Sequence, residues 1–204
     1  MNLTLIEIYE TLFKIFGKQH WWPADSQDEV IIGAILTQNT AWQNVEKAIE
    51  NLKKTNLCSL DKIRNSSQSI IEGLIKPSGF YRQKSLYLKE IASFFKNFDK
   101  NNTDTANFRK MLLNVKGIGF ETADSILLYV FSRPIFVVDA YTKRLVERKK
   151  LFYSLEYNKV QQFFMQNLPH DIELFKEYHA LIVKLGKIFC RKKPNCAGCP
   201  IKCV

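Results

Sequence analysis

The sequence is poor in residues that break helices and contains no long apolar run. Its 204 residues include eight glycines and six prolines, which leaves little room for long flexible linkers. No uninterrupted apolar stretch approaches the ~20 residues that span a bilayer. The opening stretch MNLTLIEIYE carries two glutamates and no basic leader, so it does not resemble a secretory signal. We therefore expect a soluble, cytoplasmic protein without a membrane partner.

Acidic side chains are too few to balance the basic ones. Thirty Lys and Arg face twenty Asp and Glu, which gives a formal net charge of +10. This excess favours a polyanionic partner such as nucleic acid, although basic proteins without nucleic-acid ligands are common. Apolar residues make up 46% of the chain, as is typical of a globular protein with a real core.

Period-two alternation is missing, and apolar residues recur at helical spacing instead. The first helix is predicted to end at Gly17. Ser26 and Glu29 predict a capping box before a central helix that is apolar almost all round. Only residues 133–138 suggest a short extended piece, so the predicted fold class is all-α. Later helices are expected at about 140–149, 158–168 and 171–188.

A helix-hairpin-helix pattern lies at about 108–131. Apolar residues recur in steps of three and four on both sides of Lys116-Gly117-Ile118-Gly119. The two glycines are expected to permit positive φ and to let another backbone approach closely. The free amides of the second helix, beside Lys116, form an anion site that suits a nucleic-acid phosphate. A simpler interpretation is a hairpin used for packing, with the downstream Asp139 as an N-cap.

Four of the five cysteines lie in the last fifteen residues, spaced by five, two and three residues. Such a cluster favours a metal site over a disulfide framework in a reducing compartment. Structural zinc more often uses well-separated Cys-x-x-Cys pairs, whereas compact runs suit an iron–sulfur cubane. Iron–sulfur, zinc and no metal remain open at this point. The four are Cys190, Cys196, Cys199 and Cys203.

The hairpin and the aspartate about twenty residues beyond it resemble the helix-hairpin-helix (HhH-GPD) superfamily of base-excision DNA glycosylases, whose best-known branch is endonuclease III. The resemblance implies that Gly117, Gly119 and Thr122 grip the DNA backbone, beside the Lys116 of the anion site, and that Asp139 is catalytic. It also implies two helical lobes with a DNA-binding cleft between them. The implied parts are a central barrel at 21–133, a second lobe of 1–20 plus 134–189, and a cysteine loop at 190–204.

The same resemblance implies that the cysteine loop holds a 4Fe–4S cluster, with zinc as the alternative. The spacing departs from the usual family pattern of six, two and five residues between ligands, so this loop is tighter. The basic residues Arg191, Lys192 and Lys193 follow the first cysteine and are expected to contact phosphate, as the corresponding loop does in the family. The alternative is a solvated charge run beside a metal site.

Glu121 occupies a position that decides between two reactions in this superfamily. By the resemblance, bifunctional members carry a lysine there, two residues after the second hairpin glycine, and its amine attacks the sugar and cuts the strand. A carboxylate cannot form that Schiff base, and Lys116 precedes the turn. We therefore expect a monofunctional glycosylase that uses water. The Glu121 side chain is expected to contact either the flipped base or only solvent.

Three stretches resemble the 3-methyladenine glycosylase branch: HWWP, LTQNT followed by a tryptophan, and KPSGFYRQK. In that branch aromatic residues sandwich the base, and electron-rich rings suit a cationic methylated purine. Trp21, Trp22 and Trp42 are thus candidates for the pocket, with core packing as the alternative. Gln38 and Asn39 stand where the superfamily inserts a polar wedge, although a polar loop would also explain them.

The sequence thus predicts a DNA glycosylase that releases alkylated purines, with 3-methyladenine as the expected substrate, by base flipping and without strand cleavage. Two alternatives are a bifunctional endonuclease III-type glycosylase/lyase acting on oxidised pyrimidines and a non-catalytic DNA-binding module. The expected partner is double-stranded DNA with a damaged base, bound by a monomer.

Overall fold

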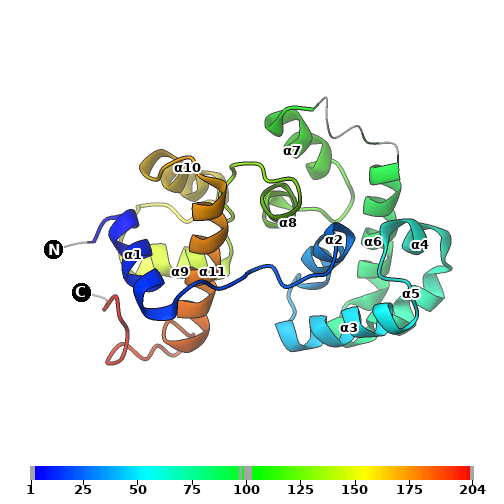
Figure 1. Ribbon diagram of the computed structural model, residues 1–204, viewed down its shortest axis with the longest axis horizontal. Coiled ribbons are helices and arrows are strands. Elements are labelled where there is room, and N and C mark those ends of the chain that lie inside the picture. Colours follow the sequence, from blue (N-terminus) through cyan, green and yellow to red (C-terminus); the bar gives the residue numbers. More distant parts are fainter. Residues whose placement is uncertain (1–2, 97, 99–102, 203–204) are drawn as a thin grey trace. The chain divides into compact units, whose positions relative to one another are not determined.

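The structure is a computed structural model that describes residues 3–96, 98 and 103–202 (Figure 1). All regular structure in these residues is helical and no strand occurs among them, so the predicted all-α class is confirmed. The segment 133–138, where a short extended piece was expected, has no regular structure. Among the described helices none has both the length and the hydropathy to cross a bilayer.

The chain forms two compact units. The central unit runs from Ala24 to Phe131, and the discontinuous unit joins the segment that ends at Pro23 to the segment that starts at Ser132. In chain order, the central unit contains α2 (Gln27–Leu36), α3 (Trp42–Lys54), α4 (Leu60–Asn65), α5 (Gln68–Ile75), the 3-10 turn η1 (Lys76–Ser78), α6 (Tyr81–Lys96), α7 (Thr105–Leu113), α8 (Phe120–Ser125) and the π turn η2 (Ile126–Val130).

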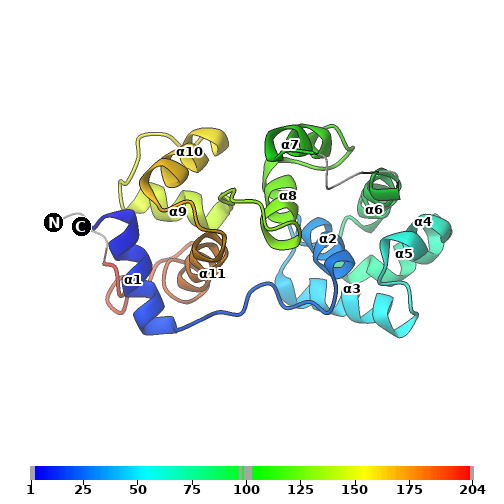
Figure 2. The same ribbon diagram turned by 45° about the horizontal axis from the view of Figure 1, so that its top comes forward.

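Helix α2 is the core of the central unit. It contacts α3, α6 and α8 (Figure 2), and residues 29–36 are all buried, as a helix that is apolar on every face requires. The Ser26 hydroxyl caps it by accepting from the Glu29 amide. The predicted capping box is incomplete, however, because the Glu29 carboxylate accepts from the Asp25 amide at 2.9 Å and pairs with Lys53 at 2.7 Å.

A buried ion pair joins the two helices of the hairpin. Arg109 of α7 donates to the fully buried carboxylate of Asp124 in α8 through Nε at 2.6 Å and Nη2 at 2.9 Å. Helix α8 then continues into the π turn, where the Phe131 amide donates to the Ile126 carbonyl at 3.3 Å. Because both carboxylate oxygens are engaged, this ion pair ties α7 to α8 across the turn.

The discontinuous unit contains α1 (Leu5–Phe16), α9 (Ala140–Arg148), α10 (Tyr157–Asn167) and α11 (Ile172–Ile188). Helix α1 ends at Gly17 as predicted. Helix α11 packs on both α1 and α9, and the buried Tyr178 hydroxyl donates to the Leu5 carbonyl at 2.8 Å. This packing brings the middle of α11 to the first turn of α9. The aromatic core of the unit comprises Phe136, Phe164, Phe175 and Tyr178.

Candidate nucleic-acid interface and active site

The turn between α7 and α8 contains two glycines with different conformations. Gly117 has a φ of +87°, and a Cβ there would lie 2.2 Å from the Tyr87 ring. Gly119 has a φ of −94°, which any residue adopts, and a Cβ built on it meets nothing within 4 Å. The expectation of positive φ thus holds for Gly117 alone. At Gly119 the missing side chain leaves open space beside the exposed Lys116.

The loop between α2 and α3, residues 37–40, is attached to the hairpin. The Gln38 side-chain amide donates to the Gly117 carbonyl and to the Thr122 hydroxyl, both at 3.0 Å. Asn39 is exposed and has a φ of +52°. Thr122 is only 6% exposed, so its hydroxyl serves Gln38. The structure thus brings Gln38, Gly117 and Thr122 together within the central unit.

Asp139 caps helix α9 from a buried position. Its Oδ1 accepts from the Thr142 amide at 2.7 Å and from the Thr142 hydroxyl at 2.9 Å, and the residue is 8% exposed. Its Oδ2 lies 3.6 Å from Nε2 of His179 on α11. The N-cap role considered from the sequence is therefore present. The N-cap contacts use Oδ1 of Asp139, while Oδ2 faces the imidazole of His179.

The surroundings of Asp139 keep it ionised. Burial alone would raise the pKa of Asp139, but His179 and the hydrogen bonds from Thr142 outweigh burial and hold that pKa below its ordinary value. A carboxylate with one oxygen fixed and little water around it can stabilise a nearby positive charge strongly, because a low dielectric weakens electrostatic interactions less than water does.

The candidate pocket residues fall in both units. Trp21 and Trp22 are half-buried in the discontinuous unit, with ring centroids 5.2 Å apart, and the Lys187 ammonium lies 5.7 Å from the Trp21 ring centroid. Trp42 is half-buried at the start of α3, and Glu121 is exposed in the first turn of α8, both in the central unit. Of these four, the structure brings Trp21 and Trp22 together.

The comparisons with known proteins match this architecture. Residues 32–170, which include the 37–40 loop, the hairpin and Asp139, match the family model described as "HhH-GPD superfamily base excision DNA repair protein". The chain belongs to the HhH-GPD superfamily. A relative from Methanocaldococcus jannaschii, which carries the provisional name of DNA repair glycosylase, is 47% identical over 97% of this chain and 94% of its own length. This HhH-GPD protein is thus a DNA repair glycosylase.

Other relatives of this glycosylase carry two different names. The crystal structure of the H. pylori 3-methyladenine DNA glycosylase bound to 1,N6-ethenoadenine is similar with a TM-score of 0.78 and 29% identity, over 91% of this chain and 98% of that one. An endonuclease III of Sulfolobus acidocaldarius is 28% identical over 84% of this chain and 78% of its own length. Both types of glycosylase are therefore similar to this HhH-GPD protein.

The cysteine loop of this HhH-GPD glycosylase is held by helix α9. Arg148 donates from Nη1 to the Cys190 sulfur at 3.2 Å, and Arg144 donates to the Cys190 carbonyl at 2.9 Å. Cys190, Cys196 and Cys199 lie in the described residues, and Cys203 lies outside them. In the described ranges no three His, Cys, Asp or Glu side chains converge as metal ligands. The donor set still fits a thiolate-bound centre, because a cationic side chain already donates to a cysteine sulfur.

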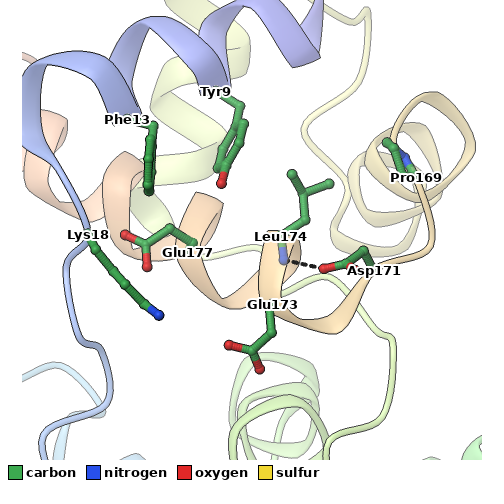
Figure 3. A pocket seen from close by; sticks show the side chains of 8 residues that line it. All are labelled: Tyr9, Phe13, Lys18, Pro169, Asp171, Glu173, Leu174 and Glu177. Atoms are coloured by element: carbon green, nitrogen blue, oxygen red, sulfur yellow. Dashed lines mark hydrogen bonds between the residues drawn. The ribbon is translucent and has the colours of Figure 1, made fainter.

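A cavity of ≈ 450 Å³ in the discontinuous unit is lined by none of the predicted site residues. Two aromatic side chains form one wall, and Lys18 lies at its edge (Figure 3). Its other polar lining residues are three carboxylates, which would repel a phosphate backbone. This acidic cavity is therefore not a candidate for binding the DNA backbone. The carboxylates are Asp171, Glu173 and Glu177.

Three residues that were not singled out from the sequence are prominent in the structure. His179 faces Asp139. The sequence feature that could have pointed to it is a polar residue on the apolar face of the helix at 172–188. Phe80 is 66% exposed with a φ of +46°, and the preceding proline and glycine were the signal for an unusual turn. Lys84 is 2% exposed, and nothing in its local sequence distinguishes it from the surface lysines.

Proposed function

We propose that this HhH-GPD glycosylase hydrolyses the N-glycosidic bond of alkylated purines in duplex DNA, with 3-methyladenine as its main substrate, and does not cleave the strand. The observation that carries the proposal is the immobilised, ionised Asp139 combined with Glu121, rather than lysine, in the first turn of α8. The similarity to the H. pylori enzyme supports the substrate class.

Duplex DNA is the proposed partner, bound by a monomer inside the cell where the chromosome lies. The net charge of +10 and the exposed Lys116, Arg191, Lys192 and Lys193 supply attraction to phosphates. We assign Gln38 and Asn39 to the gap that the flipped nucleotide leaves. Thr122, being buried, acts through its hydrogen bond to Gln38 instead of touching DNA. The exposed ring of Phe80 is suited to stacking on a base.

Release of the base requires stabilisation of positive charge on the sugar. A purine methylated at N3 already carries a positive charge and leaves readily, so little acid catalysis is needed. The Asp139 carboxylate then opposes the charge of the oxocarbenium-like sugar, and water completes the hydrolysis. Thr142 holds Oδ1, and Oδ2, which lies 3.6 Å from Nε2 of His179, is the oxygen assigned to the sugar or to the attacking water.

Recognition of the cationic base is assigned to tryptophan rings. The Lys187 ammonium lies 5.7 Å from the Trp21 ring centroid and has to leave this ring before a cationic base stacks on it, because two like charges repel. A methylated purine, which is flat and positively charged, gains stacking and cation–π attraction on such a face, whereas an oxidised pyrimidine gains neither to the same extent. Trp22, Trp42 and Glu121 are the further candidates for the base pocket.

Substitution of the two hairpin glycines is expected to have different results. Gly119→Ala should fold normally, since the φ of Gly119 is ordinary and its surroundings are open. Its affinity for duplex DNA should nevertheless fall about tenfold, because the added methyl group would displace a phosphate from the amides of the turn. Gly117→Ala should instead destabilise the fold by roughly 2 kcal/mol or more, because of its left-handed φ and the Tyr87 ring. Thermal melting and fluorescence anisotropy separate the two. Equal affinity for Gly119→Ala and wild type would contradict the phosphate contact.

We further propose that Cys190, Cys196, Cys199 and Cys203 hold a 4Fe–4S cluster, with zinc as the alternative. The cluster's chemistry is structural, cross-linking a loop that has little other regular structure. This chain's own contribution is the hydrogen bond from Arg148 to the Cys190 sulfur, together with the contacts of α9 to the loop backbone. These contacts hold the basic residues 191–193 toward solvent.

The purified protein is accordingly expected to be brown. A broad visible absorption and about four iron atoms per chain are expected for a cubane, whereas a zinc site would be colourless. Cys199→Ser should remove the colour. Cys58→Ser, which alters a half-buried cysteine of the central unit, should retain it. A colourless protein containing one zinc would rule out the iron–sulfur assignment.

A base-release assay on a panel of duplexes tests the proposed function. Release of 3-methyladenine with an intact abasic strand is expected, with little release of oxidised pyrimidines or uracil; 7-methylguanine indicates how broadly alkylated purines are accepted. The second candidate is a bifunctional endonuclease III-type enzyme, favoured by the relatives of that name. Strand cleavage at oxidised pyrimidines without release of methylated purines would show that the protein is this bifunctional enzyme.

A further inference from the structure

A buried lysine lies beside the 37–40 loop. Lys84 of α6 is 2% exposed, and its ammonium donates to three neutral oxygens. The acceptors are the Leu36 carbonyl at 2.8 Å, the Thr40 hydroxyl at 2.7 Å and the Ser78 carbonyl at 2.8 Å. The ammonium thus joins the end of α2, the end of the loop and the turn before α6.

This cation has no ionic partner in the described part of the chain. Burial lowers the pKa of Lys84 to about 8, because taking the ammonium out of water disfavours its charged form. No carboxylate comes within 4.0 Å of Nζ among the described residues, so no ion pair offsets this cost. The charged residues on α6 and on the elements packed against it are Asp28, Glu29, Asp61, Lys62, Arg64, Glu72, Lys76, Arg82, Lys89, Glu90 and Lys96.

Local contacts connect the ammonium to the tip of the loop. The Thr40 hydroxyl, which accepts from Lys84, is also within 3.1 Å of the Gln38 carbonyl. Gln38 in turn binds the hairpin through its side-chain amide. Asn39 between them has positive φ, a conformation that costs free energy for a residue other than glycine and persists where the surroundings enforce it. Lys84 and the hairpin therefore hold the loop from two sides.

We propose that the ammonium of Lys84 is a positioning group that holds Gln38 and Asn39 in the conformation that fills the gap beside a flipped base. The role rests on the proposed function, because it presumes that the 37–40 loop enters DNA. Loss of the proton leaves an amine with two donors and a lone pair. Of the three oxygens only the Thr40 hydroxyl can donate to that lone pair, and doing so takes its hydrogen away from the Ser78 and Gln38 carbonyls. The loop is then less firmly held, and base flipping declines as the pH rises through about 8.

The first test needs no DNA. Amide NMR signals of Gln38 and Asn39 in the free, 15N-labelled protein are followed from pH 6.5 to 9.5. A titration with a midpoint near 8 is expected in the wild type and should be absent from Lys84→Met, which keeps an unbranched side chain one heavy atom shorter and removes its charge. Loop signals that do not respond near pH 8 in the wild type overturn the positioning role, whatever the activity.

The second test measures the effect on base flipping. A duplex with 2-aminopurine beside a 3-methyladenine lesion reports unstacking, and single-turnover base release is recorded over the same pH range. Lys84→Met should reduce both by about tenfold at pH 7 and remove the alkaline decline. The matched control Lys89→Met alters a half-buried lysine on the same helix that also donates to a carbonyl, and it should behave as wild type.

The outcomes separate this inference from the proposed function. A wild type that releases no methylated purine refutes the proposed substrate, while the NMR titration still tests Lys84. A folded Lys84→Met variant with wild-type release and an unchanged alkaline limb overturns the role of Lys84 and leaves the glycosylase function intact. Lys84→Arg, which keeps the charge at all accessible pH values, should retain flipping at pH 9 where the wild type loses it.

Discussion

Asp139→Asn is expected to reduce base release by about 10²- to 10³-fold, the typical loss when one preorganised electrostatic contact to a transition state is removed. Affinity for duplex DNA should be unchanged or slightly tighter, because a negative charge is removed from a protein that binds phosphates. Asparagine caps helices as well as aspartate does, so the Thr142 contacts and the fold should persist. Single-turnover release and anisotropy on the same lesion duplex measure the two quantities.

Asp171→Asn is the matched control for this substitution. Asp171 is also an N-cap, its carboxylate accepts from the Leu174 amide at 2.6 Å, and it lies in the same unit as Asp139. Both variants therefore remove one carboxylate charge and replace an aspartate N-cap with asparagine, at the exposed position 171 and at the buried position 139. Normal release by Asp171→Asn together with loss of release in Asp139→Asn assigns the effect to position 139. Equal release by Asp139→Asn and wild type would remove Asp139 from the reaction.

The direction of the Asp139 pKa shift adds a pH dependence to this prediction. Burial opposes ionisation, but His179 and Thr142 hold the pKa below its ordinary value, so the carboxylate remains charged well into the acid range. A group with a depressed folded pKa stabilises the fold above its unfolded pKa, and that contribution disappears as the pH falls through the folded value. The acid loss of release attributable to Asp139 should therefore have its midpoint below the ordinary pKa of an aspartate.

Local patterns predicted the helices well because each helix buries one periodic face. Helix α1 ends at Gly17, and α11 covers 172–188 against an expected 171–188. The capping prediction at Ser26 was half right, since the hydroxyl caps α2 but the Glu29 carboxylate binds Lys53. Lys53 is 24 residues away in the sequence. A motif confined to four residues cannot include such a competitor.

The parts of the candidate site that escaped prediction all depend on contacts between distant residues. Gln38 binds Gly117 across 79 positions, and Lys84 reaches the Leu36 carbonyl across 48. His179 faces Asp139 because α11 packs on α9. The sequence could indicate which residues are polar and near a turn. It could not indicate that Thr122 would be buried and bound to Gln38, since that requires the packing of the hairpin against the 37–40 loop.

Borohydride trapping is expected to give no covalent adduct with the wild type and a clear adduct with Glu121→Lys. Trapping requires an amine that attacks the sugar, and the resemblance assigns that amine to position 121, in the first turn of α8. A lysine introduced there lies next to the positive end of a helix, which lowers its pKa and raises its neutral fraction near pH 8. The lesion duplex and reductant are the same in all reactions, and adducts are resolved by denaturing electrophoresis.

Glu121→Gln is the matched control, because it removes the carboxylate without providing an amine. It should give no adduct, so a band confined to Glu121→Lys reports the new nucleophile and not the loss of charge. A wild-type adduct would refute the monofunctional assignment and would require another lysine, with the exposed Lys116 the nearest in sequence. No adduct with either variant, while base release is retained, would place position 121 away from the sugar. The choice between water and an amine as the nucleophile then depends on side chains other than Glu121.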